Sequence, residues 1–240
     1  MSSRRKFSFG DGGIIRGDST QKKIAIVFTG HEFAEGGNFI GNTLQAKNIK
    51  ASFFFTGDFF CNPVFSPIIL DLKNNGNYIG PHSDKHLLYC DWTKRDSLLV
   101  TKDEFTNDLL NNCKQMELFT IKKERAKYFL PPYEWYNDTI AVWTKELGFQ
   151  LINYTPGTLS HTDYTTNKNK NYRSSETIYH SIIEYEKSKP DGLNGFILLM
   201  HVGAGPDRTD KFYRRLPELI NYLKEKGYQF QTVDQLLKPD

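Results

Sequence analysis

Short runs of apolar residues alternate along the chain with longer amphipathic runs. The short runs are bounded on both sides and rich in β-branched and aromatic residues, which favours strands over helices. We therefore predict seven strands, over Ile24–Phe28, Ala51–Phe55, Tyr78–Gly80, Tyr128–Leu130, Gln150–Asn153, Gly195–His201 and Tyr228–Thr232.

The amphipathic runs between these strands predict helices, and several carry start and stop signals. Ser66 and Pro67 are typical of a helix start, whereas Gly148 and Gly227 follow the ends of two helical runs. The predicted helices are Phe39–Lys47, Pro67–Asn74, Ser97–Leu118, Asn137–Leu147, Ser174–Lys187 and Lys211–Lys226.

Regular alternation of apolar strands with helices indicates a mostly parallel sheet covered by helices. About seven such units favour a single α/β domain built as a (β/α) barrel, complete or incomplete, and an open doubly wound sheet is the alternative. Residues 1–22 are polar and rich in glycine, so we predict a lead-in segment followed by one catalytic domain over residues 23–240. The polar stretch Thr155–Arg173 has no periodicity and is expected to be a long loop after a strand.

The composition removes several classes of function. Lys plus Arg (31) exceeds Asp plus Glu (28) by only 3 charges, which makes no electrostatic case for nucleic acid or an anionic membrane. Cysteine occurs three times without a CxxC pair, so neither a disulfide framework nor a cysteine zinc site is expected. No apolar run reaches the roughly 18 residues of a membrane span, and no secretory signal is visible. We expect a cytoplasmic protein; a chain exported with its leader absent from this sequence is the alternative.

The most informative local pattern is His82-Ser83-Asp84-Lys85-His86, which directly follows a predicted strand. Two imidazoles four positions apart would meet on one side of a helical turn and could bind one divalent metal ion, with Asp84 orienting a ligand from behind. Two unrelated surface histidines are the alternative interpretation.

Three further polar clusters also follow predicted strands. His201 ends an apolar strand and has the side chain that a general acid near neutral pH requires, although a hydrogen-bonded structural histidine would look the same. His31 and Glu32 follow the first strand, and Pro131–Trp135 follows another, where rigid loops are the alternative. In barrels the ligand chemistry lies at the carboxyl ends of the strands, so we expect all four clusters to share one face.

The order of these motifs resembles the polysaccharide deacetylase family, carbohydrate esterase family four, over about Lys23 to Leu237. The histidine motif H-[S/T]-x-x-H is matched in full by His82–His86, and L-x-H is matched by Leu199–His201. The family's A-T-F-F-x-x-G strand is similar to Ala51–Gly57, and its R-P-P-Y-G motif is similar to Leu130–Glu134.

This resemblance implies a distorted (β/α)7-like barrel that removes acetyl groups, N- or O-linked, from an acetylated oligo- or polysaccharide. It implies that His82 and His86 bind a divalent metal ion, often zinc, and that His201 protonates the leaving group. From the residues themselves, we expect Tyr133 and Trp135 to stack on sugar rings, with core packing as the alternative. Asp84 and Arg208 are further candidates for the substrate, and for Arg208 the alternatives are orienting His201 or lying in a solvated loop.

The chain departs from the family at its first motif, T-F-D-D. Thr29 and Gly30 occupy the positions of the base Asp and the metal-binding Asp, and Leu130 replaces the Arg that pairs with the base. Loss of both partners of a buried ion pair is coherent, because a charge left alone would be costly. We hypothesise that His31 supplies the third metal ligand.

The carboxylate base is then expected to be Glu32 or Glu134. Two alternatives to the deacetylase remain open. One is hydrolysis of another C–N bond, such as a cyclic amide, on the same fold. The other is a carbohydrate-binding homologue without catalysis.

Overall fold

The computed structural model describes residues 7–238. Its main sheet has seven strands in the order β1-β2-β8-β3-β4-β5, with β9 paired to the start of β3. The strands are β1 (Ser8–Gly10), β2 (Gly13–Arg16), β3 (Lys23–Gly30), β4 (Ser52–Phe55), β5 (Tyr78–Pro81), β8 (Phe196–His201) and β9 (Gln229–Phe230). All pairings are parallel except those of β1 with β2 and of β2 with β8.

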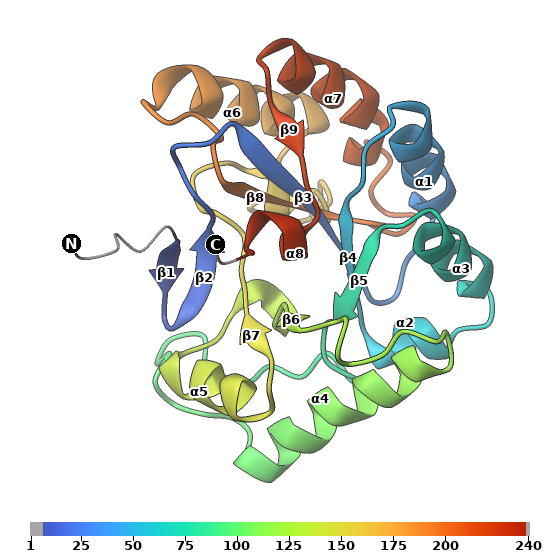
Figure 1. The fold of residues 1–240 in the computed structure, drawn as a ribbon, viewed down its shortest axis with the longest axis vertical. Coiled ribbons are helices and arrows are strands. Elements are labelled where there is room, and N and C mark those ends of the chain that lie inside the picture. The colour runs from blue at the N-terminus through green and yellow to red at the C-terminus, as the bar shows by residue number, and fades with distance from the viewer. Residues whose placement is uncertain (1–6, 239–240) are drawn as a thin grey trace.

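A second, two-stranded parallel sheet lies between β5 and β2 of the first (Figure 1). It contains β6 (Tyr128–Phe129) and β7 (Gln150–Leu151). The Leu130 amide donates to the Pro81 carbonyl at 3.3 Å, and Ile152 forms a single bridge to Ile14. The sheet thus curls into a distorted, incomplete barrel within one α/β domain. The predicted fold class is confirmed. The regular series of parallel β/α units is interrupted by β2, which pairs antiparallel with β8.

All seven predicted strands and all six predicted helices are present, with shifted ends. The helices are α1 (Gly37–Ala46), α3 (Ser66–Asn74), α4 (Lys102–Glu117), α5 (Asp138–Glu146), α6 (Ser175–Ser188) and α7 (Leu216–Glu225). The prediction started α4 five residues too early, because a reciprocal capping box of Thr101 and Glu104 fixes its first turn. It also started α7 too early, since a 3₁₀ turn (Phe212–Arg215) precedes the helix. Two short helices were not predicted, α2 (Gly57–Cys61) and α8 (Val233–Leu236).

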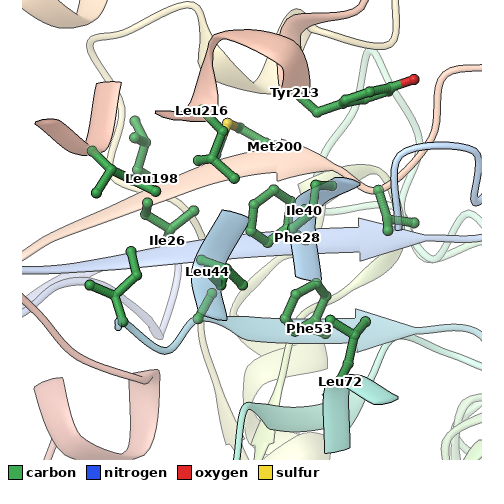
Figure 2. Packing of buried hydrophobic residues seen from close by; sticks show 14 of the residues in the cluster. Ile26, Phe28, Ile40, Leu44, Phe53, Leu72, Leu198, Met200, Tyr213 and Leu216 are labelled. Atoms are coloured by element: carbon green, nitrogen blue, oxygen red, sulfur yellow. The ribbon is translucent and has the colours of Figure 1, made fainter. Parts of the chain in front are cut away.

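The alternation of side chains along β3 separates two apolar layers. Ile26 and Phe28 face outward and pack under the covering helices, where Ile40 and Leu44 of α1 meet them (Figure 2). Val27 faces the interior of the curled sheet, in a separate cluster. Because both faces are buried, the strand is apolar throughout, as parallel strands usually are.

One end of the barrel is closed. The Val233 amide of α8 donates to Ser52 Oγ at 2.9 Å, and the side chain of Tyr128 donates to the Leu237 carbonyl. Both contacts lie where strands begin, so α8 covers that end of the barrel.

The expectation of a lead-in segment over residues 1–22 needs correction within its described part. Residues 8–16 form the β1–β2 hairpin, and β2 pairs with β8. Ile14 is buried, and the Tyr136 hydroxyl donates to the Gly10 carbonyl at 2.8 Å. The hairpin is therefore part of the sheet, although its sequence is polar and rich in glycine and did not predict a strand. Within residues 7–238, no helix combines the length and the apolar character needed to cross a bilayer.

Candidate active site

A cavity of about 590 Å³ opens at the carboxyl ends of the strands. It is lined by segments that follow β3, β5, β6, β7 and β8, so the four predicted clusters do meet, joined by a fifth segment. Five of the six histidines line it: His31, His82, His86, His161 and His201. So large a share of the imidazoles in one hollow marks it as the candidate active site.

The histidine motif does not form the helical turn that was predicted. Residues 82–86 are an irregular loop in which Ser83 (φ 76°) and His86 (φ 53°) are left-handed. The loop reverses direction, and this brings the imidazole centroids of His82 and His86 to 5.2 Å. The amide of Gly57 at the start of α2 donates to the Ser83 carbonyl at 3.0 Å, which fixes the loop from one side.

Helix α4 holds the same loop from the other side. The buried Asp108 carboxylate accepts hydrogen bonds from the amides of Asp84 (3.2 Å) and Lys85 (2.9 Å). One turn later, Asn112 accepts from the His82 amide at 2.9 Å and donates to the Phe55 carbonyl at 3.1 Å. Strained backbone persists only where its surroundings determine it, and this helix supplies that constraint.

Three imidazoles lie side by side in the cavity. The rings of His31 and His86 are stacked, with centroids 4.6 Å apart and planes 9° apart. His82 is bonded through Nδ1 to the Leu130 carbonyl at 2.7 Å, which leaves Nε2 free. Burial, helped by neighbouring imidazoles, lowers the pKa of His82 to about 3 and that of His86 to about 2. Both rings are therefore neutral near pH 7, as metal ligands must be.

The donors suit a divalent transition metal in kind, because neutral imidazoles are common ligands of zinc and similar ions. The bond from His82 to a carbonyl oxygen also matches the way that metal-binding histidines are oriented. Within residues 7–238, however, no three His, Cys, Asp or Glu side chains are already arranged around a metal position. In-plane lone pairs of stacked rings do not converge, so the ring of His31 or His86 must turn for all three to bind one ion.

The packing around the end of β3 shows where side chains at positions 29 and 30, the places of the family's two aspartates, would point. A Cβ atom on Gly30 would lie 2.8 Å from each of Phe55, Phe59 and Val202, so position 30 faces the apolar outer layer. Thr29, Gly30 and His31 all line the cavity, but a side chain added at position 30 would point away from it. The hydroxyl of Thr29 is buried and has no hydrogen-bond partner within the described chain. A side chain on this strand end can thus reach the cavity from position 31 but not from position 30 as packed here.

His201 is paired with an acid that was not predicted. Its Nδ1 lies 2.6 Å from Asp163 Oδ1, and its amide donates to Asp163 Oδ2 at 3.0 Å. Burial lowers the pKa of His201, but the Asp163 carboxylate outweighs it, so the pKa stands above its usual value. The result is an imidazole that is oriented by a carboxylate and keeps its proton to a higher pH than a free histidine does.

The two candidate bases, Glu134 and Glu32, differ in burial. Glu134 lies beside His201, half-buried, and burial raises its pKa to about 7. Its backbone and that of Tyr133 are both left-handed (φ 54° and 58°), and Asn153 donates to its carbonyl at 2.8 Å. Glu32 is exposed at the rim of the cavity.

Tyr133 and Trp135 line the cavity as expected, and Trp92 packs against both. On the wall that follows β7, Tyr154 stacks on His161 with centroids 4.6 Å apart. The Nδ1 atom of His161 is buried without a hydrogen-bond partner in the described residues.

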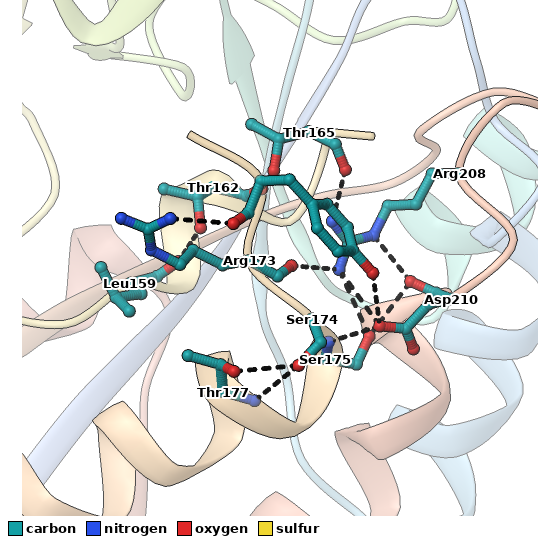
Figure 3. A network of polar contacts seen from close by, with 10 residues as sticks. Leu159, Thr162, Thr165, Arg173, Ser174, Ser175, Thr177, Arg208 and Asp210 are labelled. Atoms are coloured by element: carbon teal, nitrogen blue, oxygen red, sulfur yellow. Dashed lines mark hydrogen bonds and ion pairs between the residues drawn. The ribbon is translucent and has the colours of Figure 1, made fainter. Parts of the chain in front are cut away.

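Asp84 and Arg208, which were expected at the substrate, do not line this cavity. Asp84 lies behind the histidine loop, against Gly57. The buried guanidinium of Arg208 donates to the carbonyls of Thr165 (2.5 Å) and Arg173 (3.0 Å), as Figure 3 shows. Arg208 thus fastens the loop that carries Asp163.

A sequence profile of the polysaccharide deacetylase family matches residues 16–152, more than half of the chain. The chain belongs to the polysaccharide deacetylase family. It is 26% identical over 221 residues to a peptidoglycan-N-acetylglucosamine deacetylase of Bacillus cereus, covering 92% of this chain and 90% of the relative.

Solved structures of carbohydrate esterase family four share the fold of this deacetylase-family chain. One is a pseudoenzyme from Bacillus anthracis, with a TM-score of 0.71, 17% identity and coverage of 96% of this chain and 70% of that one. Another is an acetyl xylan esterase from Clostridium thermocellum solved with a cobalt ion, with a TM-score of 0.66, 20% identity and 89% coverage of each chain.

Proposed function

We propose that this member of the polysaccharide deacetylase family is a metal-dependent hydrolase that removes acetyl groups from a carbohydrate. The observation that carries the proposal is the assembly of His31, His82 and His86 in the same cavity as the His201–Asp163 pair. A cluster of imidazoles beside a carboxylate-bound imidazole with a raised pKa supplies the two kinds of group that metal-assisted deacetylation uses.

In this proposal His31, His82 and His86 hold the ion, preferably zinc. The ion, when bound, would supply Lewis-acid polarisation of the acetyl carbonyl and stabilise the developing oxyanion. Glu134 takes the proton of the attacking water, since a pKa of about 7 suits a base at neutral pH. His201 donates its proton to the departing amine or alkoxide, and Asp163 keeps the ring oriented for that transfer.

The aromatic walls favour a sugar as the substrate. Tyr133, Trp135 and Tyr154 present ring surfaces around the candidate catalytic groups. Peptidoglycan is the acetylated polymer named for the Bacillus cereus relative, so oligomers of N-acetylglucosamine are the first substrates to test.

The decisive measurement is zinc binding by calorimetry, together with acetate release from N-acetylglucosamine oligomers and acetylated xylo-oligosaccharides. We expect one zinc ion per chain, its loss in His82→Ala, and its retention in His31→Asp, which restores a carboxylate where the cavity accepts one. His180→Ala is the matched control, because His180 is exposed on α6 outside the cavity. Stoichiometric zinc in His82→Ala would refute the ligand set. A wild-type protein that binds these sugars but releases no acetate would instead be a carbohydrate-binding homologue.

A further inference from the structure

The guanidinium of Arg208 lies outside the cavity, in the loop that follows β8, and it is completely buried. The side chain is 1% exposed, and arginine is almost never so buried unless its donors are paired. Nε donates to the Asp210 carbonyl at 2.6 Å, and Nη1 donates to the Thr165 carbonyl at 2.5 Å. Nη2 donates to the Arg173 carbonyl at 3.0 Å. Three separate points of the main chain therefore meet at one side chain (Figure 3).

Two of these points are the ends of one segment, residues 165–173 of the long loop between β7 and α6. The guanidinium of Arg208 thus bonds both ends of the segment and joins them to the loop after β8. The carboxylate of Asp210 strengthens the junction, because it accepts a hydrogen bond from the first amide of α6 at 2.5 Å. An ion pair of Lys168 with Asp207 links the same two loops, but both side chains are exposed, and exposed pairs contribute little.

The near end of this segment is continuous with the turn that carries Asp163. The amide and the hydroxyl of Thr165 both donate to the Thr162 carbonyl, at 3.0 and 2.7 Å, which makes the turn compact. Within that turn, Asp163 bonds to His201, and the ring of Tyr164 packs on the same imidazole with centroids 4.9 Å apart. An anchor on the Thr165 carbonyl therefore limits the movement of the carboxylate that orients His201.

We propose that Arg208 is a positioning residue, which holds Asp163 against His201 by pinning both ends of residues 165–173 to the loop after β8. Arg208 does not line the cavity, so it acts through Asp163 and not on the substrate. This inference rests on the proposed function, in which His201 is the general acid.

The charge of Arg208 and its hydrogen bonds act on His201 in opposite directions. Burial and the charge of Arg208 lower the pKa of His201, whereas Asp163, and with it Glu134, raises it. Loss of the charge alone would therefore raise the pKa, but release of Asp163 would lower it. The other rings that interact with this imidazole stay unchanged in the test: Tyr164, His82, His86 and His161.

The test is the titration of His201 in Arg208→Lys, followed by NMR of the histidine rings with zinc present. Lysine keeps the charge, but one ammonium group cannot replace a fork that bonds several carbonyls. We expect the pKa of His201 to fall toward its value in Asp163→Asn. We also expect kcat/KM on N-acetylglucosamine oligomers to fall by up to about 100-fold, with KM little changed. In an Asp163→Asn background, Arg208→Lys should have no further effect on the pKa.

Arg214→Lys is the matched control, because Arg214 is exposed in the turn before α7 and has no side-chain partner among the described contacts. Circular dichroism checks that each variant is folded. If Arg208→Lys does not fold, Tyr172→Leu takes its place. It removes only a partly buried ring, which lies 5.3 Å from the Arg208 Cζ atom and bonds to Asp210, and it should lower the pKa of His201 as well.

An unchanged or raised pKa of His201 in the folded variant, or an equal fall with Asp163→Asn already in place, would overturn the positioning role. Neither result would touch the hydrolase, since acetate release by the wild type is measured separately. A lowered pKa in a protein whose wild type releases no acetate would leave the positioning role standing and reject the hydrolase.

Discussion

At the scale of single residues, the most telling position is Glu134. A non-glycine residue with positive φ is strained, and here two occur in succession, Tyr133 and Glu134. The same carboxyl group is placed where burial works against its charge. Both the backbone conformation and the buried carboxyl group of Glu134 cost folding free energy. A role in catalysis therefore explains this residue better than a role in stability does.

Replacing Glu134 with glycine should therefore separate activity from stability. We expect Glu134→Gly to raise the free energy of unfolding by about 1 kcal/mol, because glycine adopts the left-handed backbone without strain. Deacetylation should fall by about 10²- to 10⁴-fold, since the proton acceptor is gone. Urea unfolding and acetate release measure the two effects. Glu134→Ala is the control that removes the carboxyl group but keeps the strain; activity retained in both variants would move the base to Glu32.

The pairing of His201 with Asp163 predicts a particular pH dependence. The carboxylate raises the pKa of His201, so the acid form is lost only when the pH rises through that raised value. In Asp163→Asn the pKa of His201 should fall, and the alkaline limb of kcat/KM should move to lower pH. Asp207→Asn is the control, because Asp207 is exposed and paired only with Lys168 in the described contacts. An unmoved alkaline limb in Asp163→Asn would show that His201 is not the acid.

The sequence revealed the site residues that directly follow strands, and missed those that do not. His31, His82 and His201 could be predicted because each lies at or just beyond the end of a recognisable strand. Asp163 and His161 lie within the polar stretch Thr155–Arg173, where no periodicity fixes which side chain turns inward. Their positions depend on tertiary contacts such as those of the buried Arg208.

At the scale of elements, the histidine loop is clamped between two helices. The start of α2 donates amides to the loop carbonyls, and α4 accepts the loop amides through Asp108 and Asn112. The start of α4 could not be located from periodicity, because the amphipathic pattern extends back beyond its capping box. Helix α2 has five residues, too few for a helical period to show.

The clamp predicts that a residue outside the cavity controls metal binding. Asn112→Ala should lower stability by about 1–3 kcal/mol, because it removes two buried hydrogen bonds, although the His82 amide and the Phe55 carbonyl still bond to each other. Zinc affinity should fall roughly 10- to 100-fold, as the loop loses its orientation. Asn111→Ala on the same helix is the control and should change neither quantity, because Asn111 contacts only Lys114 among the described hydrogen bonds. Unchanged zinc affinity in Asn112→Ala would show that the loop is ordered without α4.

At the scale of the whole molecule, the barrel closes through a few contacts rather than through continuous pairing. Between β7 and β8 the gap is filled by β2, which bonds to β8 and bridges to Ile152. The Asn153 amide donates to the Ile14 carbonyl at 2.9 Å, just before the wall that carries Tyr154 and His161. The parallel strands could be predicted from their apolar runs, but this closing hairpin could not, because its apolar residues, Phe9, Ile14 and Ile15, are separated by a polar, glycine-rich stretch.

If the hairpin is integral to the barrel, a defect in it must weaken the whole molecule. Ile14→Ala should lower the global free energy of unfolding by about 2–5 kcal/mol, because Ile14 is only 4% exposed and packs in the barrel interior. The tryptophans lie outside the hairpin, so a single fluorescence transition shifted to lower urea is expected. Phe9→Ala in the same hairpin is the control and should change stability by less than about 0.5 kcal/mol, since Phe9 is 47% exposed. An unshifted tryptophan transition in Ile14→Ala would mean that the hairpin is an appendage and that residues 23–240 fold without it.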